Sequence, residues 1–598
     1  MDGKSHISGW QMVTVMVILL GMSCAKISSP GGGPRDTDPP VILKSEPVNG
    51  TTMFGEKSFS VSFDEYVVLD KINDKFMVSP PLTTKPGVKI KGKEIVVSWD
   101  EKLADSTTYT FYFQDAIRDN NENNPIPNFQ YVFSTGPVLD SLSVSGNVFN
   151  AFDLEVVSDM TVMMYSNLSD TAPRRIIPAY ISRPDPSGGF VISNVRPGNY
   201  RLYAVKDLNG NKIYDLDDET FAFCDSILVI TPAENSKTDL DTISFKPAAA
   251  PETTKPYIYT FGRHRIYAFT AEPRKQYLKF AERRSAGLLT FGLALPHDTT
   301  GLSVILTDVP PEAWFMEQNS RRDSFRLWIT DAGVYDRDLI EACLTYPFTD
   351  STGSDVIRKD TTTLRYTKPP AGRGSLRKPT RSFTTNLGSR IRPGTVAWFS
   401  GSAPMNQPDT SRMSFSQLID TIAKKLPVIF TRDTTDSRRY IMTAAFIPGA
   451  TYSLRCLDGA FSDIYGITSD STVYKFTVST SEDYGSVSAT LSGYAGAVIV
   501  QLLGDREKVV REIFVTSPGK IKFGLLDKGR YRMKVIYDLD GNREWTTGDF
   551  RKRRDPEPVS YYAGELDVKI NWELEQDWDI SLMNRKDVSL RSKPETKR

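Results

Sequence analysis

The sequence predicts an all-β protein built from tandem β-sandwich domains, Ig-like and transthyretin-like, in an elongated array. Short runs that alternate between apolar and polar residues recur along the chain, as over residues 58–63 and 95–99, and they are rich in β-branched and aromatic side chains. Turn residues such as Asn49-Gly50 separate these runs at short intervals. At 598 residues the chain is also too long for one hydrophobic core, so several domains are expected.

The N-terminus predicts an export signal over residues 1–23. Lys4 precedes a short apolar run over residues 12–20, which is too short to span a bilayer, and small residues lead up to Cys24. A cysteine after small residues resembles the lipobox of bacterial lipoproteins, although Gly21 stands where that motif usually has leucine. The resemblance implies lipidation of Cys24, followed by a flexible Gly/Pro-rich tether over residues 24–37. The alternative is an ordinary cleaved signal in which Cys24 has no role.

Composition excludes several classes of function. The chain has 73 basic and 73 acidic residues, so net charge gives no argument for binding nucleic acid. The basic run 551–554 is interpreted as a solvated loop. Cys224, Cys343 and Cys456 are too widely spaced for a disulfide framework or a zinc motif, and we interpret them as buried strand residues. After the signal, no apolar run reaches the length of a membrane span.

Residues 38–137 carry the motifs of the first domain. The motifs are Asp38-Pro39-Pro40, Pro47-Val48-Asn49-Gly50, Phe63-Asp64-Glu65-Tyr66-Val67, Tyr109 and the closing Tyr131-Val132-Phe133-Ser134-Thr135. They resemble the bacterial Ig-like domain first described in S-layer proteins of the SbsA type. Together with the cysteine and the tether, they resemble envelope lipoproteins of the Bacteroidota.

Residues 138–248 are predicted to form a second sandwich that recurs at residues 483–578. The pattern from Gly189 to Leu202, with Pro197-Gly198 at a turn, resembles the transthyretin-like or carboxypeptidase-regulatory sandwich. Residues 200–211 align with 531–542 at an offset of 331, and the same offset relates several positions upstream. A single offset over so many positions indicates an internal repeat.

The remaining chain supplies the other predicted domains. Residues 249–375 are interpreted as a β-sandwich and residues 376–482 as a second Ig-like domain, because 451–454 and 474–480 mirror motifs of the first. Residues 367–380 form the clearest linker, and residues 415–425 are the only good helix candidate. A polar tail is expected over 579–598.

An acidic loop follows the strand at 200–206 and its repeat. The side-chain oxygens fall at alternating positions, on Asp207, Asn209, Asn211, Asp215 and Asp218 in the first copy, and on Asp538, Asp540, Asn542, Thr546 and Asp549 in the second. Hard oxygen donors in a curled loop suit Ca²⁺. Both loops depart from an EF-hand in the place of their glycine and in their flanking strands. The alternative, compatible with the first, is a two-residue hairpin at Asn209-Gly210, joining strands at 200–206 and 212–216.

No residue set predicts catalysis. His264 lies in a charged strand and His297 in a turn, both interpreted as surface residues, and the motifs of serine hydrolases, zinc proteases and P-loop enzymes are missing. Exposed aromatics could bind glycans. The candidates are Trp314, Trp328, Trp398, Trp545, Trp572 and Trp578, most of which sit in alternating strands where a core role is expected. Trp545 follows the acidic turn where the first copy has Tyr214, and it is interpreted as a contact residue or a lid.

These observations predict a lipid-anchored scaffold or interaction protein of the cell envelope, without catalysis and with no cofactor other than Ca²⁺. Its expected partners are the membrane, through the N-terminal lipid, and other envelope proteins. The alternatives are an accessory lipoprotein of an outer-membrane assembly or uptake complex, with a β-barrel partner, and a surface glycan-binding protein. The outer membrane is the expected location. Ala25-Lys26-Ile27 after the cysteine, in place of acidic residues, favours the periplasmic face and leaves the surface face open.

Overall fold

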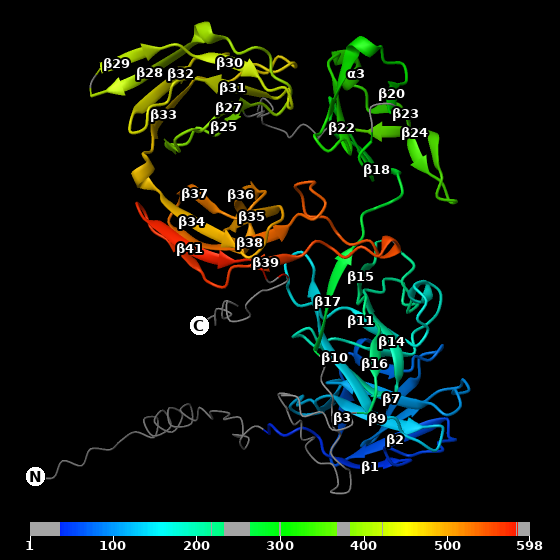
Figure 1. Cartoon of the computed structure of the whole chain (residues 1–598). Helices are drawn as coiled ribbons and strands as arrows, with labels where there is room; N and C mark the ends of the chain where they lie inside the picture. Colours follow the sequence, from blue (N-terminus) through cyan, green and yellow to red (C-terminus); the bar gives the residue numbers. More distant parts are fainter. Residues whose placement is uncertain are drawn as a thin grey trace, which may run out of the picture.

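The computed structural model of the chain describes residues 36–216, 218–232, 263–297, 301–367, 383–420, 422–581 and 583. Regular structure in these ranges is almost entirely β-strand, as Figure 1 shows, and the all-β prediction is confirmed. The α-helices α2 (Ile72–Lys75) and α3 (Ala332–Tyr335) are single turns. No helix of this described part combines the length and the apolar character that a bilayer crossing requires. The signal peptide, Cys24 and most of the tether lie outside the described residues.

The first unit, residues 36–137, packs two sheets around an aromatic core. One sheet has the order β1 (Ile42–Glu46), β2 (Ser58–Phe63), β6 (Glu94–Ser98), β5 (Gly87–Lys91). The other has the order β4 (Met77–Ser79), β7 (Thr108–Gln114), β9 (Phe129–Ser134), and β3 (Val67–Leu69) pairs with β8 (Ile117–Asp119). Strand alternation turns Phe59 of β2 toward Tyr131 of β9, and their rings stack with centroids 3.7 Å apart.

The second unit, residues 138–270, is built on one eight-stranded sheet. Its strands are β10 (Leu142–Asn150), β11 (Thr161–Tyr165), β12 (Tyr180–Ser182), β13 (Gly189–Val195), β14 (Gly198–Val205), β15 (Thr220–Phe223), β16 (Leu228–Ile230) and β17 (Arg263–Thr270). The predicted boundary at residue 248 is wrong, because β17 pairs in parallel with β10 and so completes the second unit. The apolar face of this strand, including Ile266 and Ala268, is buried in the core of that unit.

The fifth unit, residues 481–581, repeats the strand pairing of the second. Its strands are β34 (Gly485–Ser492), β35 (Val498–Leu503), β36 (Val509–Val515), β37 (Lys520–Leu526), β38 (Gly529–Tyr537), β39 (Val559–Tyr561), β40 (Leu566–Val568) and β41 (Glu573–Asp579). β34 pairs with β37 and, in parallel, with β41, as β10 pairs with β13 and β17. The predicted tail start at residue 579 is wrong, because Ile580 is buried in this core.

The third unit, residues 271–367, packs a four-stranded sheet on a three-stranded one. The first has the order β18 (Leu278–Ser285), β19 (Leu288–Leu293), β22 (Ser324–Ile329), β21 (Trp314–Gln318). The second has the order β20 (Ser303–Leu306), β23 (Leu339–Thr349), β24 (Asp355–Arg365). Apolar residues from both sheets meet in one core, among them Phe291, Leu327 and Leu344.

The fourth unit, residues 383–480, also packs two sheets around one core. Its sheets have the orders β25 (Thr384–Thr385), β27 (Ala397–Ser400), β31 (Arg439–Thr443), β30 (Ile429–Arg432), and β26 (Arg390–Ile391), β33 (Thr472–Val478), β32 (Thr451–Cys456), β28 (Met413–Ile419), β29 (Ile422–Leu426). The helix predicted over 415–425 is wrong, because β28 and β29 form an antiparallel pair across this stretch. Met413 and Phe415 are buried between exposed or half-buried neighbours with the period of a strand, and Asp420 turns the chain at φ 51°.

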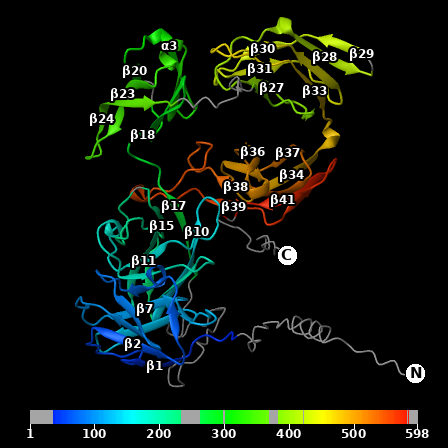
Figure 2. The same ribbon diagram turned by 180° about the vertical axis from the view of Figure 1, so that it is seen from behind.

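The five units follow one another along the chain, and the chain also folds back on itself. In Figures 1 and 2 a loop of the fifth unit, drawn in orange, reaches across to the second unit beside β15. Hydrogen bonds and ion pairs between residues some 275–330 positions apart confirm this contact, for example from Thr547 to the carbonyl of Thr270 at 2.8 Å. The predicted tandem order of sandwiches therefore includes a long-range contact that the sequence did not indicate.

Candidate functional site

The acidic loop of the fifth unit gathers three carboxylates after β38. Oxygen atoms of Asp538, Asp540 and Glu557 all lie within 4.8 Å of one another. Asp538 and Glu557 are buried, whereas Asp540 is exposed. Thr546 adds a hydroxyl that donates to Asp540 at 2.7 Å. The loop therefore gathers several hard oxygen atoms, the kind of ligand that Ca²⁺ prefers.

Glu557 is the residue that the sequence pattern missed. It lies outside the predicted ligand run, and its carboxylate accepts hydrogen bonds from the backbone N–H groups of Leu539 at 2.6 Å and Thr546 at 2.9 Å. In the second unit the fully buried Glu219 makes the equivalent bonds. Its carboxylate accepts hydrogen bonds from the backbone N–H groups of Leu208 at 3.1 Å and Asp215 at 3.2 Å. Each loop is thus closed by a buried glutamate that lies just before the next strand, β15 or β39.

The sequence signal for these glutamates is a change in the repeat offset. Thr546 matches Asp215 at the offset of 331, but Glu557 matches Glu219 at 338, because the fifth unit has seven additional residues in between. The equivalent hydrogen bonds establish the pairing, since Leu539 and Leu208 also differ by 331. An alignment that allowed this insertion would have found both residues.

The predicted hairpin at Asn209-Gly210 is wrong. The strand after β14 is β15, which begins at Thr220, and no strand is formed at 212–216. Asp207 instead curls the loop, because its carboxylate accepts the backbone N–H groups of Gly210 at 2.8 Å and Lys212 at 2.8 Å. Gly210 has φ 77°, a conformation that glycine adopts without a steric penalty. Asp538 holds the second loop in the same way, accepting from Gly541 at 2.8 Å and Arg543 at 3.2 Å.

The structure brings some of the predicted ligands together and separates others. In the first loop the amides of Asn209 and Asn211 both donate to the carboxylate of Asp215, at 3.1 and 2.9 Å. In the second loop Asn542 donates to Thr546 at 2.7 Å. Two predicted ligands lie apart. Asp549 pairs with Arg274 and is not among the three clustered carboxylates of the fifth unit, and Asp218 is exposed.

Burial and backbone hydrogen bonds shift the pKa values of the two buried glutamates in opposite directions. Burial raises the pKa of Glu557, and the N–H bonds from Thr546 and Leu539 offset part of this rise. Burial raises the pKa of Glu219 for the same reason. A bound cation would favour the ionised form of each carboxylate and lower these pKa values. A cation bound at either glutamate would therefore compete with a proton.

The tryptophans and basic residues named in the sequence analysis differ in their burial and contacts. Trp328 and Trp578 are buried, in agreement with a core role, whereas Trp572 is 59% exposed and the other three candidates are half-buried. Trp545 contacts Phe152 of the second unit with ring centroids 5.0 Å apart, and so it is a contact residue between the repeats. The solvated interpretation of the basic run is wrong for Arg553, whose guanidinium pairs with Asp225 of the second unit.

The histidine and cysteine predictions also have mixed outcomes. His297 is buried with its Nδ1 2.5 Å from the carbonyl oxygen of Arg322, so its predicted surface position is wrong. His264 lies in β17 as predicted and is half-buried. Cys456 is buried, and burial raises the pKa of its thiol to about 11. Cys224 and Cys343 are half-buried, and all three thiols are free.

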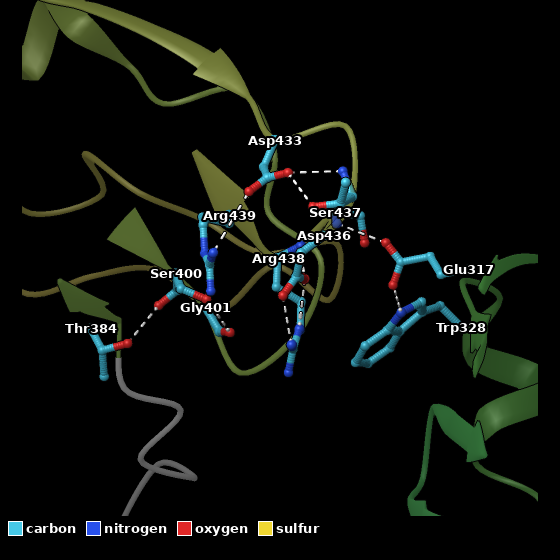
Figure 3. Close-up of polar contacts among 11 residues, drawn as sticks. Glu317, Trp328, Thr384, Ser400, Gly401, Asp433, Asp436, Ser437, Arg438 and Arg439 are labelled. Carbon is cyan, nitrogen blue, oxygen red and sulfur yellow. Dashed lines mark hydrogen bonds and ion pairs between the residues drawn. The ribbon is translucent and has the colours of Figure 1, made fainter. Parts of the chain in front are cut away.

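A second polar constellation joins the third and fourth units. Figure 3 shows Glu317 of β21 between Trp328 of β22 and Ser437 in the loop before β31. Its carboxylate accepts from the indole N–H of Trp328 and the backbone N–H of Ser437, both at 2.7 Å. Residues of both units line a shallow hollow here, namely Phe315, Glu317, Arg432, Asp433, Thr434 and Ser437. Glu317 therefore fixes the loop of one unit on the sheet of the other.

The comparisons with known proteins identify the first unit. Residues 36–135 match the family described as bacterial Ig-like domain, which confirms the resemblance for this part of the chain. No curated protein matches the sequence.

Several solved structures match parts of this chain at low sequence identity. The major pilin subunit BcpA of Bacillus cereus, in a variant form, is 8% identical over 73% of this chain and 98% of its own, with a TM-score of 0.12. The N-terminal part of the bacterial S-layer protein SbsC is 16% identical over 32% of this chain and 44% of its own, with a TM-score of 0.12. A part of native α-2-macroglobulin from Escherichia coli, spanning domains MG0-NIE-MG1, is 12% identical over 49% of this chain and 97% of its own, with a TM-score of 0.17. Scores this low carry no argument about function.

Proposed function

We propose that the protein is a lipid-anchored scaffold of the bacterial cell envelope that holds loops of several β-sandwich units in fixed positions for other envelope proteins. The observation that carries this proposal is that specific polar contacts join units at several borders. The first and second units are joined by bonds such as that from Asn194 to Thr110 at 2.9 Å. The third and fourth are joined by Glu317 and by Tyr465, whose hydroxyl donates to the carbonyl of Gly287 at 3.0 Å.

These contacts favour a rigid frame over a flexible string of domains. A buried or half-buried side chain that bonds to a backbone group of the next unit fixes distance and orientation together. Loops at the ends of the sandwiches stay exposed and are free for recognition. A scaffold needs this combination of a fixed frame and variable loops.

The sequence before residue 36 supports attachment to a membrane. If Cys24 carries a lipid, residues 24–35 can extend to about 40 Å, at roughly 3.3–3.6 Å per residue. The first unit would then be held near the membrane while the other units face outward. The arrangement resembles that of envelope lipoproteins of the Bacteroidota, and the periplasmic face of the outer membrane is the proposed location.

Substitution of Cys24 tests this proposal in cells. A Cys24→Ala variant should lose incorporation of labelled palmitate and should leave the membrane fraction, whereas a Ser23→Ala control should keep both the label and the membrane association.

Protease added to intact cells should spare the wild-type chain if it faces the periplasm. Crosslinking should then recover neighbouring envelope proteins, and recovery of a β-barrel would specify the accessory role. If the Cys24→Ala variant stayed in the membrane fraction without any lipid label, the proposed lipid anchor at Cys24 would be wrong.

We further propose that both acidic loops bind Ca²⁺. Asp538, Asp540 and Glu557 would hold the ion in the fifth unit, and Asp207, Asn209, Asp215 and Glu219 are the corresponding candidates in the second. The ion would compensate the buried charge of the glutamate and fix the loop between two strands. Its proposed role is structural, since both loops lie where a repeat meets its neighbours.

Thermal unfolding of matched variants tests the calcium sites. Ca²⁺ at 100 times its Kd should stabilise a site by about 2.7 kcal/mol and raise the melting temperature by a few degrees. A Glu219→Gln/Glu557→Gln variant should lose most of this rise, because each site loses a buried anionic ligand. Glu544→Gln is the matched control, since Glu544 is exposed in the same loop. An equal rise in all three proteins, or no rise in the wild type, would exclude the sites.

A further inference from the structure

The seven additional residues of the fifth unit lie where that unit meets the second. The second unit spans the distance from Asp215 to Glu219 with residues 216–218, whereas the fifth spans that from Thr546 to Glu557 with residues 547–556. The equivalent bonds on either side show that the added length is not needed to close the acidic loop. The insertion must therefore be explained by what it contacts.

Phe550, near the middle of the insertion, fills an aromatic socket of the second unit. Its side chain is 4% exposed, although it belongs to a loop of another unit. The socket consists of aromatic side chains from β14, β15 and β17 together with Tyr214. Ring centroids lie 4.8 Å away for Phe221, 5.4 Å for Phe223 and 5.6 Å for Tyr203. Such tilted and edge-on rings form a close-packed aromatic cluster, which contributes beyond the apolar area that it buries.

Polar bonds surround this apolar contact. Arg553 pairs with Asp225 at 2.5 Å and with Asp170 at 3.5 Å, both in the second unit. Asp549 pairs with Arg274, which follows β17. These charges fix the register of the insertion on its socket, while the buried phenylalanine supplies most of the attraction.

The second unit also reaches into the fifth. Leu154, in the loop after β10, is 5% exposed and packs among Ile499, Ile536 and Tyr561 of the fifth unit. Phe152 of the same loop contacts Trp545 and lies 3.3 Å below the Lys534 ammonium. Each repeat therefore places a loop on the sheet of the other.

We propose that residues 547–554 are an intramolecular clasp that closes units two to five into a ring. The chain itself joins the second unit to the third, and Glu317 and Tyr465 join the third to the fourth. Arg392, which pairs with Asp527 and lies over the ring of Tyr484, joins the fourth to the fifth. The clasp and the loop that carries Phe152 and Leu154 together link the fifth unit back to the second, and the clasp contributes the buried aromatic contact. Its partner is the aromatic socket of the same chain.

Shortening the insertion in the full mature chain tests the clasp. Deletion of residues 548–554 leaves three residues between Thr546 and Glu557, the number with which the second unit closes its own loop. Small-angle X-ray scattering should then show a larger maximum dimension and radius of gyration, with an unchanged far-UV circular dichroism spectrum. Trp572→Ala is the matched control, because it removes an exposed aromatic of the same unit away from the clasp and should leave the scattering unchanged.

A peptide added in trans provides an independent measurement. A labelled peptide of residues 545–556 should bind the deletion variant, whose socket is open, at least tenfold more tightly than the wild type. Changing Phe550 to Ala in the peptide should abolish binding. An unchanged scattering profile of the deletion variant would overturn the proposal. So would a wild-type dimer that dissociates on deletion, because the insertion would then join two copies.

Discussion

A single buried carboxylate determines the state of each acidic loop. Glu557 accepts backbone N–H groups from both sides of its loop, and removing it would leave buried donors without an acceptor, at a cost of about 1–3 kcal/mol. The same bonds hold an ionisable group away from water. Its protonation is therefore linked to stability without any bound ion.

The pH dependence of unfolding should report this linkage. Burial raises the pKa of Glu557 above its usual 4.5, so the folded state binds a proton at this carboxylate more tightly than the unfolded state does. Stability from this group is fully present below 4.5 and is lost as the pH rises through the higher folded value. In chelator, the difference in unfolding free energy between wild type and Glu557→Gln should thus shift in favour of the wild type as the pH falls from 7 toward 4.5.

Denaturant titrations at several pH values measure this difference directly. Glu544→Gln provides the reference, because its exposed side chain should give a nearly constant difference from the wild type. A flat profile for Glu557→Gln would mean that the glutamate has the same pKa folded and unfolded. Added Ca²⁺ should reduce the slope if the ion competes with the proton at this site.

At the scale of elements, a tyrosine fixes the entry to one strand in each repeated unit. In the second and fifth units the hydroxyls of Tyr200 and Tyr531 donate to the carbonyl four residues upstream, both at 2.9 Å. In the first and fourth, the hydroxyls of Tyr109 and Tyr452 accept the N–H five residues upstream, both at 2.9 Å. The tyrosine ring packs in the core while its hydroxyl holds the preceding loop.

Removing one such hydroxyl should weaken its unit measurably. Tyr531→Phe keeps the packed ring and loses one hydrogen bond, so we expect a loss of about 0.5–1.5 kcal/mol in the free energy of unfolding. Tyr66→Phe serves as control, because Tyr66 is 60% exposed and should change stability little. Equal stabilities of the two variants would show that the hydroxyl of Tyr531 contributes nothing.

The elements also show how far the sequence can be interpreted. Alternation predicted strands such as those at 58–63 and 95–99, although the strand expected at 212–216 is not formed. The offset of 331 superimposes β13 on β37 and β14 on β38. The helix prediction at 415–425 failed because Leu418, Ile419, Ile422 and Leu426 also fit a helical spacing, and pairing with β32 decides the matter. The acidic turns were found, but Glu557 lay beyond an insertion that a constant offset cannot cross. Both the strand at 415–425 and the position of the buried glutamates depend on contacts between segments that are distant in the sequence, which local patterns do not show.

At the scale of the whole molecule, the contact between the repeats could not be predicted from local patterns. Phe550 stands in a polar, basic stretch that is typical of a solvated loop. Its partners in β14, β15 and β17 lie about 280–350 positions away and are ordinary strand residues in sequence. In the sequence, only the unequal length of the two repeats indicates where this contact is made. An insertion in one copy of a repeat is therefore the feature to examine for a contact between copies.

The two kinds of contact in the clasp should differ in strength. Phe550 is almost fully buried, and its replacement by alanine should cost about 3–5 kcal/mol of the coupling between the second and fifth units. The Arg553–Asp225 pair is 25% and 52% exposed, so Asp225→Asn should cost at most about 1 kcal/mol, and less at high salt. Calorimetry should show the two units unfolding together in the wild type and in Asp225→Asn, but in separate transitions in Phe550→Ala. If 1 M salt alone separated the transitions, charge pairing would hold the ring, and the aromatic socket would be secondary.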